Sequence, residues 1–207
     1  MLVSLLSVII ITILSYYLYK PIRKFRYILF VITAIIAIAS HEELNYITMG
    51  YIGFSFFIVV MFSGVLEKGI IRKRLFAVRS ELAIIGTIII LPHSITYILY
   101  VLEVYKLLEI PLPAYIGTLA LLIVIPLFIT SFEYIRRKMP YRKWKALHQY
   151  SYFFFGFVGL HLILIGNDRQ LLYIILFATY FGLKTLMYFT ETRRKKQLLK
   201  NKKAIIK

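Results

Sequence analysis

The 207-residue chain contains no cysteine. This excludes disulfides, cysteine-ligated iron–sulfur clusters, thiolate haem ligands and thiol nucleophiles. Acidic residues are also scarce, with 9 Asp and Glu against 26 Lys and Arg. Charged residues make up 17% and hydrophobic residues 60% of the chain, whereas soluble domains have about 25% and about 45–50%. The composition therefore argues against both a soluble domain and an intrinsically disordered chain.

Long apolar runs dominate the sequence, and a run of about 20 residues is enough to cross a bilayer as a helix. The runs are 1–19, 27–40, 47–66, 82–102, 112–132, 146–166 and 170–190. The first run lacks a basic n-region and a small-residue cleavage site, so we expect a retained helix rather than a signal peptide. The predicted fold is an all-α, polytopic membrane helix bundle of about seven transmembrane helices, placed in the cell membrane.

The net charge of +17 would suggest nucleic acid if the chain were soluble, but the positions of the charges indicate orientation. Twenty-three of the 26 Lys and Arg residues fall in 20–26, 67–81, 133–145 and the segment after 190. These are alternate links, and cytoplasmic loops are the basic ones. We therefore expect the N-terminus outside and the C-terminus in the cytoplasm. Aromatic residues do not interleave with these charges, so the expected partner of the basic tail is membrane lipid and not nucleic acid.

Four histidines are the main chemical groups that the predicted helices offer: His41, His93, His148 and His161. We expect no cluster of buried carboxylates, and no H-E-x-x-H pattern is present, which disfavours zinc. A lone histidine in a membrane helix is most often a packing residue, but three in two predicted helices favour a ligand role. Neutral imidazole binds haem iron, and two such ligands suit an electron-transfer haem.

The depth of each histidine follows from the rise of about 1.5 Å per helical residue. His93 lies 14 residues after Arg79, about 21 Å, and His161 lies 18 residues after Lys143, about 27 Å. These two histidines are thus expected near one depth and predict a single haem between helices 82–102 and 146–166. His148 lies only about 7 Å from Lys143 and roughly 140° around the predicted helix from His161, so the two do not share a face.

Two small features of helix 82–102 also bear on this prediction. Gly86 precedes His93 by two turns, and it either leaves room for a flat macrocycle or allows close helix packing. Pro92 is expected to kink the helix beside His93.

A set of residues along these helices and the links between them forms a pattern: Arg79, His93, Pro126-Leu127, Thr130-Ser131, Trp144, Leu147-His148 and His161, with Gly53 and Ser63 on the earlier helix. This pattern resembles the ferric reductase-like transmembrane domain family, and is most similar to the haem-binding membrane subunit of the bacterial methionine sulfoxide reductase system. The similarity covers roughly residues 47–190, after helices in 1–46 and before a basic tail at 191–207.

The resemblance implies a b-type haem protein that passes electrons across the membrane, with His93, His148 and His161 as candidate ligands. Arg79 then either holds an anionic group of a cofactor or is one more basic residue of the inner link. Larger relatives carry a cytosolic flavin and nicotinamide domain. This chain has no G-x-G-x-x-G pattern and ends 17 residues after the last predicted helix, so we expect no such domain. The expected cofactors are one haem b, or two, and FMN as a further candidate.

Two classes of function follow. The first is an oxidoreductase component that accepts electrons from a cytosolic flavoprotein reductase, a bound flavin or quinol, and delivers them to an outer-side redox protein or ferric iron. The alternative is a non-redox membrane protein such as a small transporter or an assembly subunit. Transporters commonly contain inverted repeats and polar midplane sites, and the sequence has neither an evident repeat nor a polar path.

Overall fold

The computed structural model describes residues 2–39, 46–106, 109–165 and 169–205. In these ranges the regular structure is helical and contains no strand, which confirms the all-α class. His41 lies outside the described residues. The helices are α1 (Leu2–Tyr17), α2 (Tyr19–Lys24), α3 (Arg26–Ala39), α4 (Tyr46–Ser63), α5 (Ile70–Ala77), α6 (Arg79–Val104), α7 (Leu112–Ser131), α8 (Glu133–Lys138), α9 (Tyr141–Gln149), α10 (Ser151–Leu164) and α11 (Gln170–Ile205).

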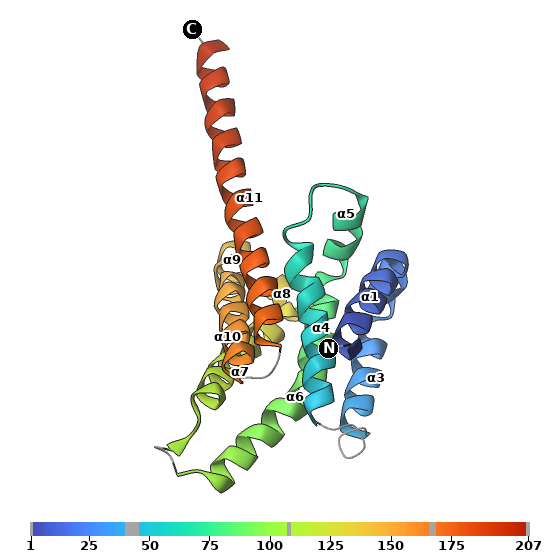
Figure 1. Cartoon of the computed structure of the whole chain (residues 1–207). Helices are drawn as coiled ribbons and strands as arrows, with labels where there is room; N and C mark the ends of the chain where they lie inside the picture. The colour runs from blue at the N-terminus through green and yellow to red at the C-terminus, as the bar shows by residue number, and fades with distance from the viewer. Residues whose placement is uncertain (1, 40–45, 107–108, 166–168, 206–207) are drawn as a thin grey trace.

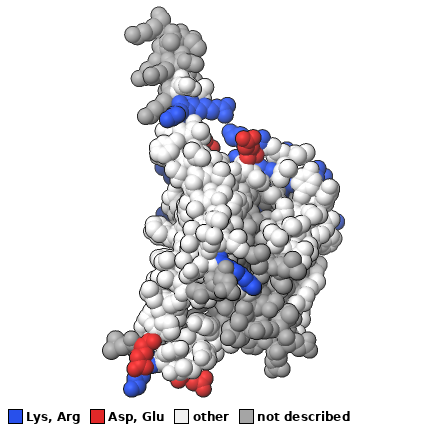
Figure 2. Space-filling view, in the orientation of Figure 1, with Lys and Arg blue, Asp and Glu red and all other residues white. Residues whose placement is uncertain are grey.

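The sides of the molecule are apolar. In the part of the chain that the structure describes, three helical segments are long and apolar enough to cross a membrane: Arg79–Val104, Leu112–Ser131 and Gln170–Arg194. Shorter apolar segments occur in α1, α3 and α4, so the count of seven spans stays a prediction. Large hydrophobic side chains are exposed along α1, α3 and α11, and Figure 2 shows few charges on the sides of this face. Such a surface suits lipid rather than water.

The helices pack as two adjoining groups (Figure 1). In the first group α4 lies along α6, with α1 against α4 and α3 against α6. In the second group α7 packs along α10, and α11 packs against α10. Contacts between α6 and α7 join the groups. The short helices α2, α5, α8 and α9 occupy the basic links, and α11 continues as one helix well past the bundle (Figure 1).

Two facing glycines explain the close approach of α4 and α6. A Cβ on Gly86 would lie 2.8 Å from Cβ of Phe56, and a Cβ on Gly53 would lie 3.0 Å from the carbonyl oxygen of Gly86. Small residues at such contacts are typical of membrane helices. Of the two readings for Gly86, the structure supports helix packing.

The apolar run 146–166 is not one helix, contrary to the sequence prediction. The amphipathic helix α9 ends at Gln149 and α10 begins at Ser151, with Tyr150 between them. His148 and His161 therefore belong to different helices, so the angle of roughly 140° predicted for one straight helix does not apply to them. The prediction failed because the apolar residues of α9 extend the hydropathy signal of α10. Pro92, by contrast, lies inside α6 without ending it.

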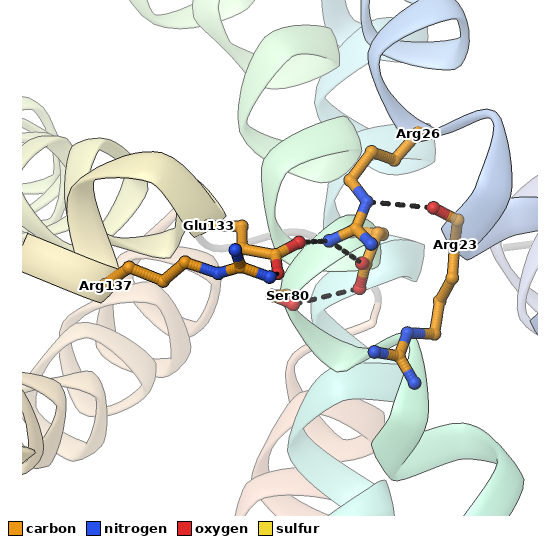
Figure 3. A network of polar contacts seen from close by, with 6 residues as sticks. Arg23, Arg26, Ser80, Glu133 and Arg137 are labelled. Atoms are coloured by element: carbon orange, nitrogen blue, oxygen red, sulfur yellow. Dashed lines mark hydrogen bonds and ion pairs between the residues drawn. The ribbon is translucent and has the colours of Figure 1, made fainter.

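A buried ionic cluster joins α3, α6 and α8 (Figure 3). Arg26 pairs with Glu81 at 3.3 Å and also with Glu133, which in turn pairs with Arg137. Only 2% of Glu81 is exposed, and its carboxylate also accepts a hydrogen bond from the Ser80 hydroxyl at 2.9 Å. Glu81 is the buried carboxylate of this cluster, and Glu133 is half-buried. The pairing was not predicted, because Glu81 and Glu133 are distant in sequence and only helix packing brings them to one arginine.

This cluster gives a stability prediction. Removing one partner of a buried ion pair leaves the other charge uncompensated. We expect Arg26→Gln to destabilise the protein by up to about 3 kcal/mol, the low end for buried pairs, because Arg26 and Glu133 keep some contact with solvent. Thermal unfolding of the purified protein measures this effect. Arg23→Gln, at an exposed position, is the matched control. Equal unfolding temperatures for the two variants would contradict the prediction.

Candidate functional site

A cavity of about 410 Å³ lies between α4, α6, α7 and α10. Its volume is in the range of small-molecule and cofactor sites. His93 enters the lining from α6 and His161 from α10, so the structure brings two of the predicted histidines to one cavity. The other lining residues are mostly apolar: Gly50, Tyr51, Phe54, Ile90, Ser94, Tyr97, Ile98, Ala114, Gly117, Thr118, Ala120, Leu121, Val124, Phe154, Val158, Leu162 and Ile165.

The ring of His161 is held by α7. Its Nδ1 lies 2.8 Å from the carbonyl oxygen of Pro113, and because a carbonyl only accepts, Nδ1 carries the proton. The Nε2 atom then keeps the lone pair that a metal ligand needs, which is the usual arrangement for ligating histidines. A Cβ on Gly117 would lie 3.0 Å from two atoms of the ring. Gly117 therefore leaves the space that this ring occupies.

The ring of His93 has a matching environment on α4. A Cβ on Gly50 would lie 3.1 Å from Nδ1 of His93. The ring also stacks with that of Tyr97, one turn later, with centroids 6.4 Å apart and an angle of 16° between planes. Each histidine of the cavity thus lies against a glycine of a neighbouring helix.

This donor set fits a haem. The cavity offers two imidazoles from different helices, one of them in the tautomer for ligation through Nε2, and an apolar lining for a flat macrocycle. A metal bound by protein side chains alone fits less well, since no group of three or more His, Cys, Asp or Glu comes together in the part of the chain that the structure describes. His93 and His161 are the residues that would hold such a group, and the haem would supply a one-electron redox centre.

His148 lies elsewhere and does not line this cavity. Its Nε2 is 3.1 Å from Oγ1 of Thr130, and its ring packs against Trp144 with centroids 4.3 Å apart. The indole N–H of Trp144 donates to the carbonyl oxygen of Thr130 at 3.1 Å. The Thr-Ser end of α7 and the Trp-x-x-Leu-His pattern of α9 are therefore one contact. Burial, with the positive charges of Arg79 and Arg136, lowers the pKa of His148 to about 4, so its imidazole is neutral near pH 7.

Arg79 is the first residue of α6, whereas His93 lies in the second half of that helix. Its guanidinium lies over the ring of Phe76, with 5.3 Å to the centroid, and close to Gly64. Tyr152 and Tyr180 are near enough to interact with its charge. Among the described residues no carboxylate forms an ion pair with Arg79. A guanidinium in these surroundings is suited to an anionic group.

Sequence reasoning missed several residues around the histidines. Gly50, Gly117 and the carbonyl of Pro113 shape the site, yet glycine and proline are common in membrane helices and carried no signal. Glu81 carried a signal that was overlooked, because an acidic residue just inside a long apolar helix is costly unless it is paired.

Residues 49–159 are similar to those of a known protein family. The profile of a family described as ferric reductase like transmembrane component matches residues 49–159, more than half of the chain. The chain belongs to the ferric reductase-like transmembrane component family. Membership in this family, together with the long apolar helices, identifies a multi-pass membrane protein. The matched range includes His93 and His148 and ends two residues before His161.

This ferric reductase-like chain is also similar to a protein of Treponema pallidum (strain Nichols) that is named only as uncharacterized. The two sequences are 25% identical over an alignment that covers 86% of this chain. The chain spans 58% of the length of that relative. No solved structure matches the chain.

The glycine at His161 gives a test of the site geometry. In Gly117→Ala the new Cβ would sit 3.0 Å from the ring, so the ring must shift by a few tenths of an ångström. We expect lower haem content and a shifted haem absorption band in the purified variant. Gly156→Ala, where a Cβ meets nothing within 4 Å, is the control and should match the wild type. A wild-type spectrum and haem content in Gly117→Ala would contradict this geometry.

Proposed function

We propose that this chain carries electrons through one b-type haem held between α6 and α10 by His93 and His161. The observation that carries the proposal is the shared cavity, which two histidines from different helices line together. The fixed tautomer of His161 supports its role as a ligand. A haem bound there supplies a reversible one-electron centre within the membrane.

The direction of transfer in this proposal follows from charge. The basic links favour a cytoplasmic position for the Arg79 end of α6. Electrons then enter from a cytosolic flavoprotein reductase, a bound flavin or quinol, and leave on the outer side. The residues shared with the haem-binding subunit of the methionine sulfoxide reductase system favour an outer-side redox protein as acceptor, with ferric iron as the alternative.

Arg79 has a separate role in this proposal. It lies 14 residues from His93, about 21 Å along α6, so it serves a group other than the haem between His93 and His161. Its place near Tyr152 and Tyr180, without a carboxylate partner among the described residues, supports an anionic group of the electron donor, such as the phosphate of FMN. His148, which is bound to Thr130, is a ligand in this scheme only if a second, inner haem binds.

Histidine substitution tests the haem assignment. His93→Ala and His161→Ala should each abolish the low-spin b-haem spectrum of the purified protein, because loss of one axial ligand opens the iron. His41→Ala should keep the full spectrum, and His148→Ala should lower haem content only if a second site exists. A well-folded His93→Ala protein that keeps a full low-spin spectrum would show that the assignment is wrong.

Substitution of Arg79 tests the inner site. Arg79→Lys keeps the charge but loses the planar, bidentate donor. We expect FMN, titrated by fluorescence, to bind the variant about tenfold more weakly, as loss of a charge-assisted hydrogen bond implies. Arg72→Lys is the matched control, since Arg72 also lies over Phe76 but on α5. Unchanged FMN binding in Arg79→Lys would identify Arg79 as an orienting charge only.

A further inference from the structure

A polar cluster lies where α11 begins, formed by Arg169, Tyr51 and Tyr173. The guanidinium of Arg169 donates to the Tyr51 hydroxyl at 3.4 Å and lies 5.7 Å from the centroid of that ring. The Tyr173 side chain interacts with both Tyr51 and Arg169. The backbone N–H of Tyr173 donates to the Arg169 carbonyl at 3.2 Å, which fixes the arginine at the first turn of α11.

This cluster borders the cavity of the two histidines. Tyr51 belongs to both, because its side chain lines the cavity while its hydroxyl meets Arg169. Tyr173 reaches the same wall, with its ring 6.4 Å from that of Phe54, another lining residue. One guanidinium and two phenols, all possible donors, are therefore gathered at one edge of an otherwise apolar cavity.

The chemistry of this edge suits carboxylates. Arginine binds carboxylates through paired, charge-assisted hydrogen bonds, and a phenol adds a further donor. No Lys or Arg occurs among the described residues that line the cavity itself. Arg79 is 14 residues from His93 along α6, about 21 Å by helical rise. The cluster thus places a positive charge next to the cavity.

We infer that Arg169, supported by Tyr51 and Tyr173, binds the carboxylate groups on the edge of the haem that His93 and His161 hold. This inference rests on the proposed function and fixes the orientation of the macrocycle in its site. The carboxylate edge faces the link between α10 and α11, the outer side under the charge rule, and away from Arg79. Arg169 is a positioning residue whose charge also favours the reduced haem, because reduction removes one positive charge from the iron.

The test exchanges carboxylates for esters. Purified full-length protein, freed of pigment, is loaded with haem or with haem dimethyl ester, and the rate of pigment loss to apomyoglobin is measured. The wild type should lose the ester about tenfold faster than haem, as loss of a charge-assisted bond implies. Arg169→Gln should lose both pigments at one rate and should show a lower haem midpoint potential than the wild type. Lys106→Gln, the other outer basic position, is the control and should behave as the wild type.

The possible results distinguish failure of the carboxylate-binding inference from failure of the proposed function. If Arg169→Gln still distinguishes haem from its ester as strongly as the wild type, the carboxylates are held elsewhere and the inference fails. If the wild type does not distinguish them, the cluster only joins α4 to α11. Tyr51→Phe, which keeps the ring and removes the donor, gives the same comparison should Arg169→Gln fold poorly, with a smaller loss of discrimination expected. If the wild type binds neither pigment, the proposed function itself fails.

Discussion

Two histidine rings lie against glycines of neighbouring helices, and the arrangement of the central helices depends on these contacts. A Cβ at Gly117 would meet the ring of His161, and one at Gly50 would meet that of His93. In a hydrocarbon medium a ring nitrogen needs a partner, since water is absent. The carbonyl of Pro113 meets this need for Nδ1 of His161 and thereby leaves Nε2 for a ligand. The same few contacts thus set the spacing of these helices and the tautomer of His161, and they leave its Nε2 able to bind a ligand.

Charge is distributed in a way that keeps this centre apolar. The buried pairs of Arg26 with Glu81 and Glu133 lie at the ends of α3, α6 and α8, and they neutralise one another there. Arg79 lies at the same end of α6, while Arg169 and Tyr51 lie beside the cavity. The proposed transfer of electrons across the membrane needs binding groups on both sides of this centre. The two arginines provide a chemical basis for binding an anionic group at each end.

The fold class could be predicted from the sequence because it depends on strong local signals. Long apolar runs can only be helices in a membrane, and depth along a helix follows from residue number. This sufficed to place His93 and His161 near one level, and both line one cavity. The break at Tyr150 was missed since hydropathy does not register a one-residue interruption between two helices.

Contacts between segments that are far apart in the sequence could not be predicted from the sequence. Glu81 and Glu133 meet at Arg26 only after three helices pack, so the place of Glu81 in a long apolar helix indicates that it needs a partner but not which one. The roles of the glycines were equally hard to predict: the sequence left Gly86 with two roles, room for a macrocycle or helix packing, and it did not single out Gly50 and Gly117, which lie beside the histidines. The role of each glycine depends on which side chain faces it in the folded structure, and residue type alone does not reveal that.

Electron paramagnetic resonance of the purified, oxidised wild-type protein, with haem quantified per chain, tests the central claim most directly. Two imidazole ligands on one haem predict a low-spin ferric signal typical of bis-histidine coordination and one haem for each chain. A high-spin signal, or a colourless protein after expression with sufficient haem, would contradict the assignment of His93 and His161 as the axial pair.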